Sequence, residues 1–322
     1  MKTKLAVIIP AYKKIFFRQT LESLAKQSDK RFKVYVGDDA SPENLQPVVD
    51  EYSSLLDITY VRFGMNLGRK DLVAHWNRCL EMVGNEDFVC LFSDDDLMEE
   101  NCVRQFYVCM ETNPDYDVYH FNINIIDKDG TVISEPGSFP ESISHVEFFK
   151  GLYMGRIDAR MPEFIFRTSI LKSKGFVSFP RAYRSDNATV ISCASGTGIR
   201  TITGLDAKVL WRDSGINMSS SAELESIACH SDANISFFNW SHKYFGKEYP
   251  LSANVEKRWI VNLLASLYPD YSLRELFWRL LKYYRPVGGN MTYRIETFFY
   301  LVKVIRRKYK QIRTIPCRKI MF

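Results

Sequence analysis

The chain has 322 residues, and its 46% hydrophobic and 25% charged residues are the balance of an ordinary globular protein with a large core. The net charge of +5 is local, because residues 297–322 hold eight basic side chains and no acidic one, whereas the remainder has 35 basic against 38 acidic residues. With no apolar stretch of the ~18 residues that span a bilayer, this pattern excludes an integral membrane protein and one that tracks nucleic acid along its surface.

Residues 1–115 alternate strand and helix patterns. The apolar run LAVIIP at residues 5–10 ends at a proline and is typical of a central parallel strand, since it is too short for the apolar segment of a signal peptide. Further strands are predicted over residues 32–36, 58–63 and 87–92, and helices over 16–26, 45–52, 72–83 and 99–111. The alternation predicts a doubly wound α/β fold, in which ligands bind at the carboxyl ends of the strands.

Polar and aromatic clusters follow three of these strands. Pro10 and Tyr12 come after the first, Asp38 and Asp39 after the second, and the acidic run 94–96 after the fourth. Carboxyl ends of parallel strands share one edge of the sheet. We therefore expect the three clusters to converge there.

The acidic run Asp94, Asp95 and Asp96 has two interpretations. Like charges this close repel one another, so they need either full solvation on a surface turn or a hard divalent cation that also takes phosphate oxygens. The run follows the buried strand DFVCLF at the ligand edge of the sheet, and this position favours the metal.

Asp38, Asp39 and Tyr12 also have structural alternatives. Asp39 or Ser41 would cap a following helix, or a carboxylate here would bind the base or ribose of a nucleotide. Tyr12 would stack on a base or close its loop. Neither GxGxxG nor GxxxxGK[ST] occurs in the chain, so a diphosphate would be held by a metal instead of a glycine-rich loop.

The pattern changes after residue 115. A hairpin is predicted over residues 116–134 around the turn DKDG, and a helical region begins near residue 222. Strands are expected over residues 163–167, 200–203 and 207–211, and helices over 169–174, 186–194, 256–268, 273–284 and 293–312. Seven scattered cysteines without a CxxC pair predict free thiols in a reducing cytoplasm, with no zinc site and no disulfide framework.

The segments VIIPAYKK, QTLESLAKQSDKRFKVYVGDDAS, NLGRKDLVAHWNRCLE and FVCLFSDDDLM, in this order and spacing, resemble the family 2 glycosyltransferases of the GT-A fold. The resemblance covers residues 4–115 and continues through YRSDNATVISCASGTGIRTI and VLWRDSGINMS. It implies a GT-A domain over residues 1–220, with nucleotide-sugar binding in 1–115 and acceptor binding and catalysis in 116–220. Residues 221–322 would form a helical C-terminal region.

The resemblance also implies site residues. Asp94 and Asp96 would bind Mg²⁺ or Mn²⁺ as the family's DxD element, with Ser93 standing at the first acidic place of the more common pattern. Asp186 would be the catalytic base, and a helix cap is its alternative role. The implied contacts with the nucleotide sugar come from Pro10, Tyr12, Asp38, Asp39, Arg69, Asp94, Asp95 and Arg212.

These roles imply an inverting, metal-dependent transfer of a sugar from a nucleoside-diphosphate donor, expected to be UDP-linked, to a saccharide or lipid-linked acceptor in surface polysaccharide or lipopolysaccharide synthesis. A nucleotidyltransferase, or a non-catalytic carbohydrate- or partner-binding protein on the same fold, stays an alternative. No nucleic-acid partner is expected. The basic tail, with Phe299 and Val302 beside Lys303 and Arg306, predicts peripheral attachment to the inner face of the cell membrane, the alternative being a helix that packs on the catalytic domain.

Overall fold

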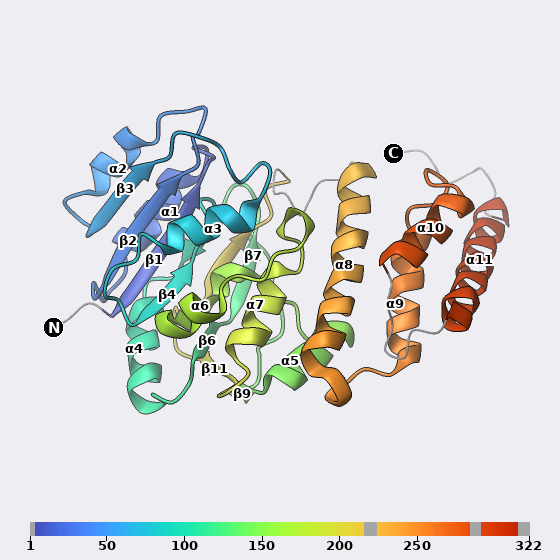
Figure 1. Cartoon of the computed structure of the whole chain (residues 1–322). Coiled ribbons are helices and arrows are strands. Elements are labelled where there is room, and N and C mark those ends of the chain that lie inside the picture. The colour runs from blue at the N-terminus through green and yellow to red at the C-terminus, as the bar shows by residue number, and fades with distance from the viewer. Residues whose placement is uncertain (1–3, 216–223, 284–290, 315–322) are drawn as a thin grey trace. The chain divides into compact units, whose positions relative to one another are not determined.

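The computed structural model describes residues 4–215, 224–283 and 291–314 (Figure 1). Its contacts divide the chain into two compact units. The first comprises residues 1–178 and 185–220, and the second comprises 179–184 and 221–322. None of the helices in the described ranges is long and apolar enough to cross a membrane.

The first unit is built on a mixed sheet that is parallel along one half. Its strands are, in spatial order, β3 (Ile58–Arg62), β2 (Phe32–Asp38), β1 (Leu5–Ala11), β4 (Phe88–Leu91), β10 (Phe164–Arg167), β6 (Val118–Phe121), β11 (Ile199–Ile202) and β9 (Ser142–Ile143). The first four run parallel, whereas β10 is antiparallel to both of its neighbours. The expected mostly parallel sheet flanked by helices is confirmed.

A second, smaller sheet lies beside the acidic run. It has the order β5 (Leu97–Met98), β12 (Val209–Arg212), β7 (Ile123–Ile126) and β8 (Val132–Ser134). β5 begins directly after Asp96, and β12 pairs with it antiparallel. This pairing brings Arg212 to the acidic run although more than a hundred residues separate them.

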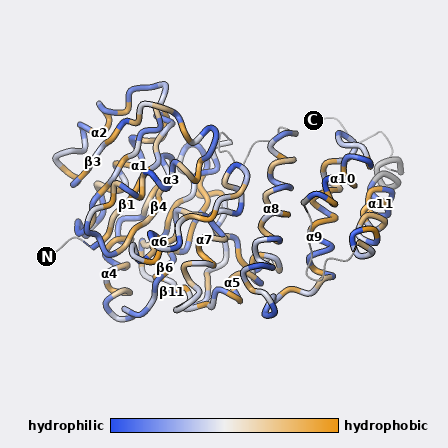
Figure 2. The backbone as a smooth tube through the Cα atoms, in the orientation of Figure 1, coloured by the Kyte–Doolittle hydropathy of each residue, from blue (hydrophilic) through white to orange (hydrophobic). Residues whose placement is uncertain are grey.

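Helices cover both faces of the parallel half of the large sheet. Leu5, Val7 and Ile9 of β1 pack in one core with side chains from α1, α2 and α4, while the alternate residues Ala6 and Ile8 face α3 and are also fully buried. Burial on both faces explains why this strand is apolar throughout, as Figure 2 shows along β1 and β4. The helices of this unit are α1 (Phe17–Ala25), α2 (Gln46–Tyr52), α3 (Leu72–Leu80), α4 (Cys102–Thr112), α5 (His145–Tyr153), α6 (Thr168–Lys174) and α7 (Ser185–Cys193), with the short 3-10 helix η1 (Met161–Glu163).

The second unit is helical, as expected. It contains η2 (Pro180–Ala182), α8 (Leu224–Phe245), η4 (Gly246–Glu248), α9 (Ala253–Ala265), α10 (Leu273–Tyr283) and α11 (Met291–Thr314). Residues 179–184 belong to this unit because Tyr183 hydrogen-bonds Ser226 and Arg184 hydrogen-bonds Asn234, both on α8, at 2.8 Å. This segment ends one residue before α7 begins, two residues before Asp186.

The segment 116–126 differs from the expected single strand. It breaks at Asn122, so β6 joins the large sheet and β7 joins the small one. The hairpin of β7 and β8 around residues 127–131 is present, with Asp127 N–H bonded to the Thr131 carbonyl at 2.9 Å. One segment thus links the two sheets.

Candidate active site

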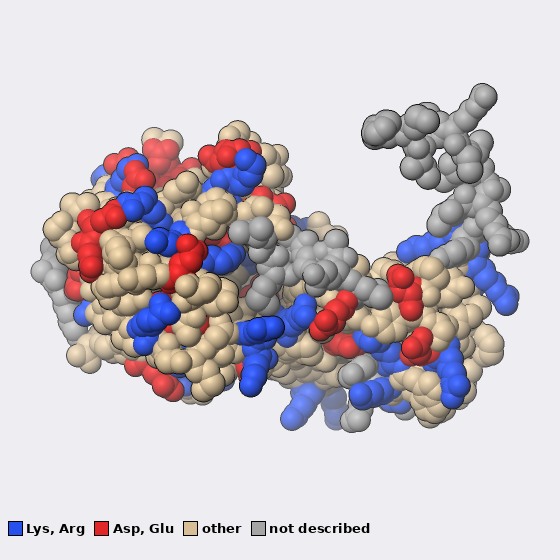
Figure 3. All heavy atoms as spheres, turned by 90° about the horizontal axis from the view of Figure 1, so that it is seen from above, with Lys and Arg blue, Asp and Glu red and all other residues tan. Residues whose placement is uncertain are grey.

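The carboxyl ends of β1, β2 and β4 meet at one edge of the large sheet. The register pairs Ala11 with Asp38 and Ile8 with Leu91, so Tyr12, Asp38 and the residues after β4 lie at neighbouring strand ends. Figure 3 shows acidic and basic side chains interspersed over the face of this unit that it draws. Because the two signs of charge are mixed over this face, the surface charge does not mark the site, and the individual contacts at the strand ends describe it better.

Asp94 ties the loop after β4 to the loop after β1. Its Oδ2 accepts hydrogen bonds from the backbone N–H groups of Tyr12, at 2.8 Å, and Lys13, at 2.7 Å. Asp94 is 6% exposed, so these two bonds stabilise a carboxylate that burial would otherwise disfavour. Two of the clusters expected to converge are thus joined directly.

Asp96 ties the same loop to the small sheet. Its Oδ1 accepts the backbone N–H of Arg212 at 2.8 Å, and its carbonyl accepts the Thr20 hydroxyl at 2.9 Å. Its other oxygen, Oδ2, is buried and has no hydrogen-bond partner within the described residues. A buried carboxylate oxygen in this state is suited to receive a cation.

Arg212 lies beneath the acidic run instead of facing outward. Its guanidinium donates through Nε to the Asp95 carbonyl at 2.8 Å, through its Nη atoms to the carbonyls of Asp127 and Lys128, and to Gln19 Oε1 at 2.7 Å. The side chain is fully buried. These contacts give Arg212 a role in fixing the acidic loop, and its contact with the donor phosphates stays a prediction.

Asp95 carries the one described ion pair at the acidic run. Lys13 Nζ lies 2.8 Å from Asp95 Oδ2. The Lys13 side chain is 31% exposed and that of Asp95 is 9% exposed. The pair is therefore half-open to the solvent at the strand edge.

The pKa values of the acidic run follow from burial and mutual repulsion. Burial raises the pKa of Asp94 and of Asp96, and the neighbouring charge of Asp95 raises both further. Burial by itself would lower the pKa of the Lys13 ammonium. The nearby carboxylates of Asp95 and Asp94 have the larger combined effect, so the pKa is raised. The loop thus favours additional positive charge.

Asp38 is held by side chains of β3 and by the loop that follows β2. Oδ1 accepts the Ser41 N–H at 2.7 Å, and Oδ2 accepts the Tyr60 hydroxyl at 2.5 Å and Arg62 at 2.9 Å. Ser41 in turn donates its hydroxyl to the Tyr12 carbonyl at 2.7 Å. Asp38 is fully buried and organises the loop between the first two strand ends.

Asp39 organises the loop that contains Arg69. Its two oxygens accept the N–H groups of Leu67, at 2.7 Å, and Gly68, at 2.8 Å, and Arg78 hydrogen-bonds the same carboxylate. Arg69 follows Gly68 in this loop and is exposed. A contact of Asp38, Asp39 or Arg69 with the nucleotide stays a prediction.

Tyr12 and Pro10 differ in exposure. The Tyr12 side chain is 44% exposed while both of its backbone polar groups are bonded, to Asp94 and to Ser41. Its ring is therefore held at the edge and is accessible for stacking on a base. Pro10 is a half-buried residue inside β1.

Asp186 lies in the first turn of α7 and is half-buried. Its Oδ1 accepts the N–H of the next residue, Asn187, at 2.7 Å. A capping side chain instead bonds an N–H two or three residues further on, and α7 already begins at Ser185, one residue before Asp186. A carboxylate has two oxygens and several lone pairs, so this bond is compatible with proton transfer. The role of Asp186 as the base stays a prediction.

The residues at this edge fit a divalent cation by their donor chemistry. Asp95 and the free Oδ2 of Asp96 supply hard carboxylate oxygens, and Mg²⁺ typically combines one or two carboxylates with the phosphates of a bound substrate. Within the described ranges, no cluster of three or more His, Cys, Asp or Glu side chains is arranged to hold a metal by itself.

Several residues that shape the site carry little sequence signal. Lys13 directly follows Tyr12, which the sequence did predict, and this neighbourhood is the only sign in the sequence that Lys13 belongs to the site. Gln19 lies on α1, and Tyr60 and Arg62 lie on β3, where nothing in the pattern distinguishes them from surface residues. Each acts by holding a residue that the sequence did identify.

A family model described as Glycosyl transferase family 2 matches residues 6–172. The matched region contains β1 from its second residue on, and all of β2, β4 and the acidic run. No curated protein sequence matches the chain.

Solved structures resemble this one over nearly its whole length. The structure of residues 1–349 of S. aureus TarS in complex with UDP-GlcNAc is 18% identical, with a TM-score of 0.59, and the match covers 97% of this chain and 92% of that one. A mannosyltransferase, PcManGT from Pyrobaculum calidifontis, in complex with GDP-Man and Mn²⁺, is 16% identical with a TM-score of 0.54, covering 94% and 86%. At these identities the likeness concerns the fold.

Proposed function

Because the chain belongs to glycosyl transferase family 2 and has the GT-A fold, we propose that it transfers a sugar from a nucleoside-diphosphate sugar to an acceptor hydroxyl. The donor is expected to be UDP-linked, and the acceptor a saccharide or a lipid-linked saccharide of surface polysaccharide or lipopolysaccharide synthesis. Support for a nucleotide-sugar donor comes from the similar structures, which hold UDP-GlcNAc and GDP-Man.

One observation carries the proposal. The backbone of Tyr12 and Lys13 is hydrogen-bonded to Asp94, so an accessible aromatic ring and three carboxylates are fixed at the same strand edge. In doubly wound sheets this edge is where ligands bind. An aromatic ring suits a base, and carboxylates suit a diphosphate with its cation.

The proposed reaction is a single displacement at the anomeric carbon. Asp186 accepts the proton of the acceptor hydroxyl while that oxygen forms a bond to C1 and the bond from C1 to the diphosphate oxygen breaks. The configuration at C1 inverts. Asp95 and Asp96 would hold a divalent cation, which would supply Lewis-acid stabilisation to the departing diphosphate. The sequence pointed to Asp94 and Asp96 as its ligands, but Asp94 Oδ2 already accepts two backbone N–H groups, so we place Asp94 beside the cation. Arg212 keeps the carboxylates in place from below.

Calorimetric titration with UDP and with GDP, each with and without Mn²⁺, separates this proposal from its alternatives. A glycosyltransferase should bind one nucleoside diphosphate in a Mn²⁺-dependent manner. A nucleotidyltransferase should prefer UTP or GTP with a sugar phosphate. A non-catalytic carbohydrate-binding protein should bind saccharides equally well with EDTA.

We also propose that α11 attaches the protein to an anionic membrane. Leu301 and Ile305 are buried where α11 packs on α9 and α10, so part of the tail's apolar character serves packing. A separate stripe stays exposed: Met291 is 55%, Ile295 41% and Phe299 68% exposed. Residues at this spacing share one side of a helix.

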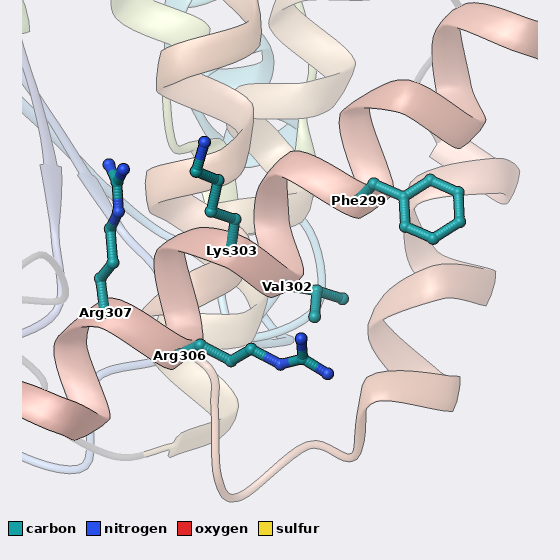
Figure 4. A pocket seen from close by; sticks show the side chains of 5 residues that line it. All are labelled: Phe299, Val302, Lys303, Arg306 and Arg307. Carbon is teal, nitrogen blue, oxygen red and sulfur yellow. The ribbon is translucent and has the colours of Figure 1, made fainter.

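Cations lie beside the exposed stripe. Phe299, Val302, Lys303, Arg306 and Arg307 line a surface hollow on α11 (Figure 4). Figure 4 shows Phe299, Val302 and Arg306 projecting from one side of the helix and Lys303 and Arg307 from another. Exposed apolar side chains flanked by cations match the interface of an anionic lipid surface.

Replacing Arg306 and Arg307 together by glutamate should therefore weaken binding to vesicles with 30% phosphatidylserine by at least about tenfold, since each cation near such a surface contributes about 1 kcal/mol. Co-sedimentation measures this. Phe299→Ser should also weaken binding, whereas Leu205→Ser, an equally apolar substitution at an 80% exposed site in the first unit, should not. Equal sedimentation of all variants would contradict the attachment.

A further inference from the structure

The Lys13 ammonium, from the loop after β1, lies against the acidic run 94–96. Its Nζ lies 2.8 Å from Asp95 Oδ2, and its own backbone N–H donates to Asp94 Oδ2 at 2.7 Å. The backbone is thus fixed to one aspartate while the side chain neutralises the next. An ammonium on a four-carbon stem can leave Asp95 without any change in the backbone.

The three aspartates differ in what holds them. Asp94 accepts backbone N–H groups of the first loop, and Asp96 accepts the backbone N–H of Arg212. The described contact of the Asp95 carboxylate is with the Lys13 side chain, which is 31% exposed. Asp95 is therefore the aspartate that can change its partner most easily.

Charge explains why a counter-ion is needed there. Three successive carboxylates that are each less than 10% exposed repel one another, and a positive charge beside them relieves this repulsion. A divalent cation would supply the same compensation when the donor is bound. Lys13 and the cation then compete for the same carboxylate oxygen.

We propose that Lys13 is an internal counter-ion that holds Asp95 until the donor arrives, then yields Asp95 to the divalent cation and turns to the diphosphate. The proposal rests on the proposed function, because it presumes a cation and a diphosphate at this edge. The Lys13 ammonium forms an ion pair with the loop and its side chain is 31% exposed, so its movement requires no opening of the core. Lysine binds phosphate oxygens as a point charge.

Two effects of opposite sign follow. Without Lys13, a cation meets no competitor at Asp95, so Mn²⁺ should bind more tightly in the absence of nucleotide. The same change removes a positive charge from the diphosphate, so UDP should bind more weakly in the presence of Mn²⁺. A purely structural lysine would weaken both.

The test compares wild type, Lys13→Met and Lys14→Met, by the electron paramagnetic resonance signal of free Mn²⁺ and by calorimetry with UDP at saturating Mn²⁺. Lys14 is the neighbouring lysine, and no ion pair of its side chain is described in the structure. For Lys13→Met we expect about fivefold tighter Mn²⁺ binding without nucleotide and about tenfold weaker UDP binding. Lys14→Met should match wild type in both.

Mn²⁺ binding to Lys13→Met that is equal to or weaker than wild type would overturn the counter-ion role. If Lys13→Met does not fold, Lys13→Arg serves as the second variant, and its longer planar group should change UDP affinity while keeping Mn²⁺ affinity near wild type. Tighter Mn²⁺ binding to Lys13→Arg would refute the proposal. Wild-type protein that binds no UDP with Mn²⁺ would instead refute the proposed function.

Discussion

Asp186→Asn is expected to lower kcat by about 10²- to 10⁴-fold, the usual contribution of a general base. Asparagine cannot take the proton of the acceptor hydroxyl, but its side-chain oxygen can still accept the N–H of Asn187 at the start of α7. The helix should therefore persist and the affinity for the nucleoside diphosphate should stay near that of wild type. Initial rates of transfer and calorimetry with UDP measure the two quantities.

The control for Asp186 is Asp115→Asn, which makes the same chemical change at an exposed aspartate of the first unit. It should leave kcat and nucleotide affinity unchanged. Near-normal turnover of Asp186→Asn would remove the base assignment and leave the local bond to Asn187 as the role of this residue. A joint loss of turnover and UDP binding would place Asp186 at the donor instead.

Arg212→Met should lower the free energy of unfolding by about 3–5 kcal/mol, the cost typical of removing one partner from a buried charged network. The substitution leaves Gln19 Oε1 and the carbonyls of Asp95, Asp127 and Lys128 without their donor in a site that water does not reach. Because the acidic loop is fixed by these bonds, UDP affinity with Mn²⁺ should fall too. Urea unfolding and calorimetry test both effects.

Arg167→Met is the matched control for stability. Like Arg212, Arg167 donates to backbone carbonyls, here two of them, and it forms an ion pair with Asp117 at 2.8 Å, but its side chain is 31% exposed. Water can replace its contacts, so the loss should stay within about 1 kcal/mol. Equal losses in the free energy of unfolding for the two variants would show that the buried bonds of Arg212 stabilise the protein no more than the half-exposed bonds of Arg167.

The inner strands β1, β2 and β4 of the parallel half were predictable because they are buried on both faces. The run at residues 5–10 is apolar throughout, and β1 occupies Leu5–Ala11. The break at Asn122 was not predictable, since β6 and β7 are equally apolar and only their partners differ. Strand partners depend on the whole topology and leave no local signal.

One helix was missed although its signal is present. α5 begins after Ser144, whose hydroxyl accepts the N–H of Glu147 at 3.1 Å. A serine followed three residues later by a glutamate is a known pattern for the start of a helix. The signal lies in a stretch rich in proline and serine, which favours the interpretation as a loop.

At the site, the sequence identified the strand ends but not the directions of the side chains. The convergence of Tyr12 with Asp94 follows from parallel strands and could be expected. The burial of Arg212 beneath the loop depends on the pairing of β5 with β12, and the ion pair of Lys13 with Asp95 joins residues 82 positions apart. Such contacts are set by tertiary packing, which spacing rules do not describe.

The donor titration tests the central claim most directly. Wild-type protein titrated with UDP and GDP should bind one of them, and at least about tenfold more tightly with Mn²⁺ than with EDTA, because a cation shared between carboxylates and diphosphate couples the two binding events. Binding of neither nucleotide in the presence of Mn²⁺, or affinities that are identical with Mn²⁺ and with EDTA, would contradict a diphosphate–metal site at Asp94, Asp95 and Asp96.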